Sequence, residues 1–162
     1  MLITLKRIKQ LILFFEDSLI VLLLSATILL AGSQILLRNL FDSGLIWADP
    51  TLRIMVLWLA LLGAIAATRE NRHIRIDILS HRLSQRSQSI LATVNNLFSA
   101  VVCAIITWHA VRFVHAEWQD GATLFAAIPA WLGEIIIPIG FGVMTLRFLF
   151  NLALQLSQRD GG

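Results

Sequence analysis

The sequence is poor in charge and cysteine and lacks tyrosine, and these shortages exclude several classes of protein. Only 14% of its 162 residues are charged, against about a quarter in soluble domains, while 57% are hydrophobic. This number of charged residues is too small to cover the surface of a water-soluble fold of this length. The composition therefore predicts an integral membrane protein. A net charge of +3, without a clustered basic face, argues against nucleic-acid binding. One cysteine excludes an internal disulfide and any CxxC redox or zinc site.

Four stretches are apolar and long enough to cross a hydrocarbon core of roughly 30 Å, which takes about 20 helical residues. The fold class predicted is an all-α integral membrane protein, a single membrane domain with four transmembrane helices. The spans run approximately over residues 13–40, 50–69, 87–115 and 131–156 of the chain 1–162.

The first span also has the basic start and apolar run of a secretory signal peptide. Ala31-Gly32-Ser33 resembles a cleavage site. However, the apolar run is as long as a full span, and Glu16 and Asp17 interrupt its front. We therefore expect this helix to be retained.

The loop charges predict the orientation. Basic residues precede span one and fill the loop between spans two and three, whereas the other two loops are acidic or neutral. By the positive-inside rule, both termini and the central loop are cytoplasmic, an N-in and C-in arrangement. Trp47, Trp118 and Trp131 then fall at the outer interface, where an aromatic belt is expected.

Local patterns predict how the second span begins. Asp49-Pro50 is typical of a helix start, with Asp49 as the cap and Pro50 at the first helical position. Arg53 follows Asp49 by four residues, the spacing of a favourable acid-base pair on one helix face.

The second span also carries small residues at close intervals, and a short helix is predicted after it. Small side chains let another helix approach closely, so a packing face is predicted. The small residues of the packing face are Ala60, Gly63, Ala64, Ala67 and Thr68.

A short amphipathic helix is predicted in the following loop, with Asp77 as its cap. It would lie along the cytoplasmic surface, where basic residues meet lipid headgroups.

Patterns for catalysis and cofactors are missing. His109 and His115 are six residues apart, about 240° around a helix, so they cannot bind one metal from the same face. Phosphate-binding glycine loops and nucleophile elbows are absent, and Cys103 is interpreted as a packing residue. The central stretches carry no carboxylate for ion coupling. We expect no enzyme activity, no catalytic residue, no cofactor and no metal, and favour an accessory or scaffold subunit.

Several motifs together resemble a known family. Gln34-x-x-x-Arg38 is followed by Trp47-Ala48-Asp49, Arg53, Trp58 and Leu62-Gly63-Ala64, then by Arg69 and His73-Ile74-x-Ile76-Asp77, and the closing segment is Ile137-Pro138-Ile139-Gly140-Phe141 with Arg147. In order and spacing, over nearly the whole chain, these resemble the small (Q-type, four-helix) membrane subunit of the tripartite ATP-independent periplasmic (TRAP) transporters. Pro50 departs from the pattern, because the family often has a second acidic residue there.

The resemblance implies a role in the bacterial inner (cytoplasmic) membrane. The chain would scaffold a large, sodium-coupled, multi-helix permease subunit for uptake of a small organic acid that a periplasmic substrate-binding protein delivers. Residues expected at subunit or phospholipid interfaces are Arg38, Trp47, Asp49, Arg53, Trp58, Gly63, Arg69, His73, Asp77 and Pro138.

Two alternatives remain open on the residues alone. A small self-assembling, proton-coupled exporter would need a membrane carboxylate, and Glu16 or Glu134 would have to serve. A quinone or haem membrane anchor is the other alternative.

Overall fold

The computed structural model describes residues 2–70, 85–125 and 128–159, and these are mostly helical. The long helices are α1 (Leu2–Phe41), α2 (Ala48–Ala67), α4 (Gln85–Asp120) and α6 (Ile136–Arg159). The short elements are the 3₁₀ helix η1 (Thr68–Glu70), strands β1 (Thr123–Phe125) and β2 (Ile128–Pro129), and helix α5 (Ala130–Glu134).

Four helical stretches are long and apolar enough to cross a membrane, which confirms the predicted fold class. They are Gln10–Phe41, Ala48–Ala67, Ile90–Asp120 and Ala130–Gln155. The amphipathic helix predicted between the second and third spans falls on residues 71–84, outside the described residues. His73 and Asp77 fall there too.

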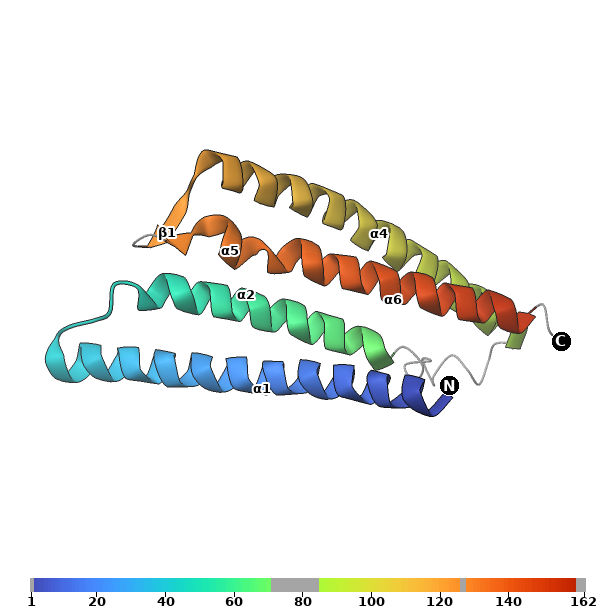
Figure 1. Ribbon diagram of the computed structural model, residues 1–162, viewed down its shortest axis with the longest axis horizontal. Helices are drawn as coiled ribbons and strands as arrows, with labels where there is room; N and C mark the ends of the chain where they lie inside the picture. Colours follow the sequence, from blue (N-terminus) through green and yellow to red (C-terminus); the bar gives the residue numbers. More distant parts are fainter. Residues whose placement is uncertain (1, 71–84, 126–127, 160–162) are drawn as a thin grey trace.

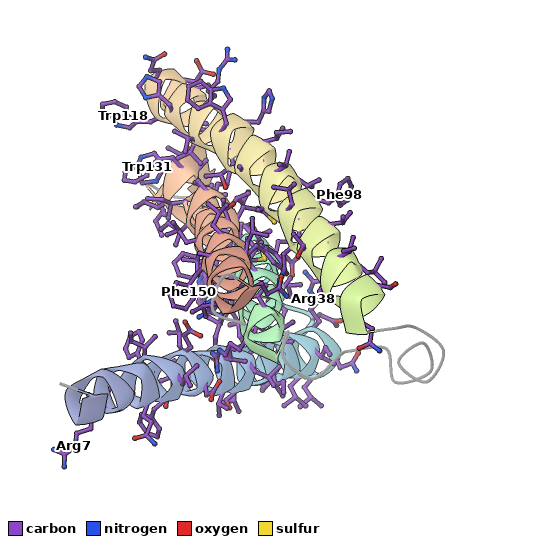
Figure 2. The ribbon with its side chains drawn as sticks, turned by 90° about the vertical axis from the view of Figure 1, so that its right-hand side faces the viewer. Arg7, Arg38, Phe98, Trp118, Trp131 and Phe150 are labelled. Carbon is purple, nitrogen blue, oxygen red and sulfur yellow. The ribbon has the colours of Figure 1, made fainter. Side chains whose placement is uncertain are left out.

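The four long helices lie side by side in an open row (Figure 1). The extensive contacts join α1 to α2, α2 to α6 and α6 to α4, so α1 and α4 form the two edges. When the protein is viewed along the direction in which the helices run, α1 crosses the other long helices obliquely (Figure 2). Both termini lie at one end, here called the termini end, and the α1–α2 connection and the two strands lie at the other, here called the loop end (Figure 1).

Helix α2 begins earlier than the sequence pattern predicts. Its first residue is Ala48, Trp47 occupies the N-cap, and no side chain caps the helix. The prediction of Asp49 as the cap was therefore wrong. Asp49 lies inside the first turn, where a negative charge is still favourable to the helix dipole, and its carboxylate is used elsewhere.

The fourth span is broken in two. Helix α5 ends at Glu134, and α6 begins at Ile136. Pro138 explains the break, because its missing N–H leaves the carbonyl of Glu134 without the usual helical donor and its ring crowds that carbonyl. The ladder resumes with Ile139, whose N–H donates to the carbonyl oxygen of Ile135 at 3.4 Å.

The core forms where α2, α4 and α6 meet. It contains Leu62, Ile65, Cys103 and Met144, all less than a tenth exposed, with side chains of α1 packed against it. The location of Cys103 confirms its interpretation as a packing residue. The row is otherwise open, and large apolar side chains such as Phe98 and Phe150 point outward from α4 and α6 (Figure 2).

Candidate functional site

At the loop end, polar side chains fasten α1 to the start of α2. The amide of Gln34 spans the connection: its Nε2 donates to the carbonyl oxygen of Leu45 at 3.2 Å, and its Oε1 accepts from the Leu45 N–H at 3.0 Å. Arg38 Nη2 lies 2.7 Å from Asp49 Oδ2. Gln34 is buried, whereas the ion pair is more than half exposed. We call these four residues the loop-end clamp.

A surface pocket of about 350 Å³ lies beside this clamp. It opens between the last turn of α1 and the connection to α2. Of the predicted interface residues, Arg38 and Asp49 are brought together here and both line the pocket, which is completed by Asp42, Ser43, Gly44, Leu45 and Ile46.

At the termini end, a second set of polar groups joins three helices. Arg69 Nη1 lies 2.6 Å from Asp17 Oδ1, and Arg69 also forms an ion pair with Glu16. Arg147 Nη2 donates to Glu16 Oε1 at 2.6 Å, and Arg147 Nη1 donates to the carbonyl oxygen of Ile65 at 2.5 Å. We call Glu16, Asp17, Arg69 and Arg147 the termini-end clamp.

The charges of the termini-end clamp balance, with two guanidinium groups facing two carboxylates. Glu16, Arg69 and Arg147 are only 17–23% exposed, while Asp17 is 62% exposed. Partly buried ions require partners, because an uncompensated charge away from water is costly. The clamp therefore fixes α1 to η1, and α6 both to α1 and to the last turn of α2.

The clamp at the termini end contains functional residues that sequence reasoning missed. Arg69 was a predicted interface residue, but its partners were not predicted, and Arg147 entered only as part of the family's closing motif. A signal was present in the spacing. Glu16 near the start of span one, Arg69 at the end of span two and Arg147 late in span four all fall at one membrane end in a four-span chain.

Other predicted site residues occupy separate places. Trp58 Nε1 donates to the carbonyl oxygen of Gly133 at 2.8 Å and so joins α2 to α5. Pro138 is half-buried in the first turn of α6. Trp47 is 43% exposed beside the loop-end clamp. Arg53 is exposed, and Arg38 takes the place on Asp49 that sequence spacing assigned to Arg53.

The small residues along α2 and at its C-cap form one stripe that is covered on one side only. Ala64 packs against the core, and Thr68 donates its hydroxyl to the carbonyl oxygen of Ile65 at 2.6 Å. Ala60, Gly63 and Ala67 are exposed instead. A Cβ atom added at Gly63 would meet nothing within 4 Å. Within the described parts of the chain, this side of α2 has no helix packed on Gly63.

Comparison with known proteins identifies the family. Residues 27–158 match the model of the family described as tripartite ATP-independent periplasmic transporters, DctQ component. The chain is 24% identical to the C4-dicarboxylate TRAP transporter small permease protein DctQ of Vibrio cholerae, over 87% of this chain and 70% of that one. It is 29% identical to a putative TRAP transporter small permease protein of Haemophilus influenzae, over 73% of this chain and 79% of that one.

A third relative is much longer. The isethionate TRAP transporter permease protein DctMQ of Oleidesulfovibrio alaskensis is 25% identical over 68% of this chain, which spans only 18% of that relative's length. Together with the four apolar helices, the TRAP permease relatives make the chain a multi-pass protein of the bacterial inner membrane. The chain belongs to the DctQ component family of the tripartite ATP-independent periplasmic transporters.

Proposed function

We propose that this chain scaffolds a large, sodium-coupled permease subunit during uptake of a small organic acid delivered by a periplasmic binding protein. The observation that carries the proposal is the uncovered stripe of Ala60, Gly63 and Ala67 on α2, in a member of this family. Small residues permit close backbone contact, which is a main source of helix association in lipid. The stripe is a surface on α2, in the middle of the row, against which a partner helix can pack.

The long relative DctMQ supports a large permease as that partner. The region similar to this chain makes up 18% of DctMQ, so there it is covalently part of a much larger permease. A separate small chain must achieve the same proximity through its own surfaces. The cargo is proposed only as a class, since the relatives are named for C4-dicarboxylate and isethionate, both organic acids.

The residues predicted at subunit or lipid interfaces divide by location in this proposal. Gly63 contacts the large subunit, and exposed Arg53 and Trp47 face partners or phospholipid at the loop end. Trp58 and Arg69, which are bonded within the chain, act by holding the helices in position.

The proton-coupled exporter is not favoured by the contacts of its candidate carboxylate. Glu16, one of the two carboxylates considered for that role, forms ion pairs with both Arg69 and Arg147, so it is engaged in holding the helices of this chain together. A coupling carboxylate must instead release and regain a proton in each cycle.

The test is copurification of the large permease with variants of the stripe. Gly63→Leu places a branched side chain where the partner helix would approach, so the large permease should be lost from the complex. Gly32→Leu on α1 is the matched control, because a Cβ there also meets nothing within 4 Å. Retention of the partner by Gly63→Leu, with normal sodium-driven uptake in liposomes, would contradict the proposal.

We further propose that both termini are cytoplasmic, on the basis of the basic loops at that end. Cysteines placed near each terminus and at exposed Ile46 in the α1–α2 connection can be labelled in intact cells with a membrane-impermeant maleimide. Only the cysteine at residue 46 should react. Labelling of the termini with residue 46 protected would reverse the orientation.

A further inference from the structure

Helix α1 continues well past the point where it is fastened to the rest of the protein. The termini-end clamp holds it at Glu16 and Asp17, beside the end of α2. The residues before Glu16, 2–15, extend beyond that point for about four turns, or about 21 Å at 1.5 Å per residue. We call this segment the N-terminal arm.

The arm exposes large apolar side chains. Leu11, Ile12, Phe14 and Phe15 are 67%, 52%, 72% and 68% exposed, although they directly precede the charged clamp. A helix end of this composition is unsuited to water, since each large side chain left exposed forgoes the gain of burial. The described part of the chain provides no cover for these side chains.

The charge of the arm has one sign. Its sequence contains Lys6, Arg7 and Lys9 and no acidic residue before Glu16. Arg7 is exposed and lies near the free end of α1 (Figure 2). Glu16 and Asp17 cannot compensate this charge, because both are paired with arginine within the clamp.

We propose that the N-terminal arm carries the first membrane span out through the interface of the inner leaflet and binds the headgroups of anionic phospholipids there. The apolar side chains from Leu11 to Phe15 belong to the start of the span and lie among the acyl chains. The basic residues that precede them then fall at the level of the headgroups, where Arg7 meets the lipid phosphates. The inference rests on the cytoplasmic N-terminus proposed above, but not on any protein partner.

The first experiment measures lipid selectivity in the full chain. The chain is reconstituted in bilayers with spin-labelled phosphatidylglycerol or phosphatidylcholine, and the motionally restricted lipid is compared. Each basic group near a surface attracts anionic lipid by about fivefold. We expect Arg7→Gln to lower the preference for phosphatidylglycerol by up to about fivefold, the change of Lys6, Arg7 and Lys9 to glutamine to lower it further, and Arg7→Lys to preserve it. Equal selectivity of Arg7→Gln and the unchanged chain overturns the proposal.

The second experiment measures the position of the arm. A nitroxide at Phe14, introduced as Phe14→Cys in a Cys103→Ala background, should be accessible to oxygen dissolved in acyl chains and shielded from a water-soluble nickel chelate. Access of the chelate places the arm in water and overturns the proposal. Loss of access to both reagents after assembly with the large permease also overturns it, because the arm is then a subunit contact.

These measurements do not depend on the proposed scaffold role. If the large permease does not copurify but phosphatidylglycerol selectivity follows Arg7, the scaffold role fails and the arm's lipid binding stands. The cysteine labelling described above tests the orientation separately, and a periplasmic N-terminus would overturn the assignment to the inner leaflet.

Discussion

Replacing Glu16 tests whether the termini-end clamp stabilises the fold. Glu16→Gln keeps the shape and an oxygen for Arg147, but leaves Arg69 and Arg147 with Asp17 as their sole carboxylate in the clamp. Removing one partner of a buried ion pair costs about 3–5 kcal/mol. The side chains of Glu16, Arg69 and Arg147 are still about a fifth exposed, so we expect a loss of stability at the lower end of this range, about 3 kcal/mol.

The exposed pair at the loop end gives a matched control. Asp49→Asn makes the same carboxylate-to-amide change, but Arg38 and Asp49 are 59% and 51% exposed. Exposed pairs contribute about 0–1 kcal/mol. For chains of this size, 1 kcal/mol shifts the melting temperature by about 2–4 °C, so Glu16→Gln should lower it by roughly 6–12 °C and Asp49→Asn by no more than about 4 °C.

The assay is unfolding of the purified chain in mixed micelles, followed by SDS titration and by heating. A double variant, Glu16→Met with Arg147→Met, leaves Arg69 paired with Asp17 and so restores charge balance. Buried pairs replaced together by apolar residues are often tolerated, so the double variant should regain most of the lost stability. Equal shifts for Glu16→Gln and Asp49→Asn, or additive loss in the double variant, would refute the reasoning.

Two further substitutions test contacts within the row. Gln34→Leu removes both hydrogen bonds to Leu45 from a buried position, and a loss of about 2 kcal/mol is expected in the same SDS titration, with no loss for exposed Gln10→Leu. Gly133→Ala would put a Cβ 2.8 Å from Ile54 Cδ1, and this overpacking should cost about 1–3 kcal/mol of stability. Gly63→Ala is the control, because a Cβ there has open space and should be neutral or slightly stabilising. If Gly133→Ala costs no stability, α5 can shift to make room and the expectation of overpacking is wrong.

The sequence predicted those features that depend on local composition. Uncharged runs of about 20 residues indicated the four helices, because a helix in lipid must be apolar along its length. The break in the fourth span also has a local cause, because the missing N–H of Pro138 acts within one helical turn. The two strands and the early start of α2 at Ala48 were not predicted.

The order of helices across the row could not be read from local patterns. Span four lies between spans two and three, so Arg147 reaches Glu16 and Ile65, which are far from it in sequence. Sequence alone gave the depth of each charge but not its neighbours. For the same reason, the small residues of α2 indicated close packing without saying on which face a partner would lie.

The residues predicted together at interfaces have two different roles in the structure: some hold the helices of this chain together, and others are free to contact a partner. Arg69 and Trp58 are bonded inside the chain, so changing them should weaken the fold before it weakens assembly. Gly63 has no neighbour within 4 Å of an added Cβ, so enlarging it should leave the isolated chain intact and affect only what binds there. A scaffold needs this division, because its own helices must stay fixed while a partner is held on the surface left open.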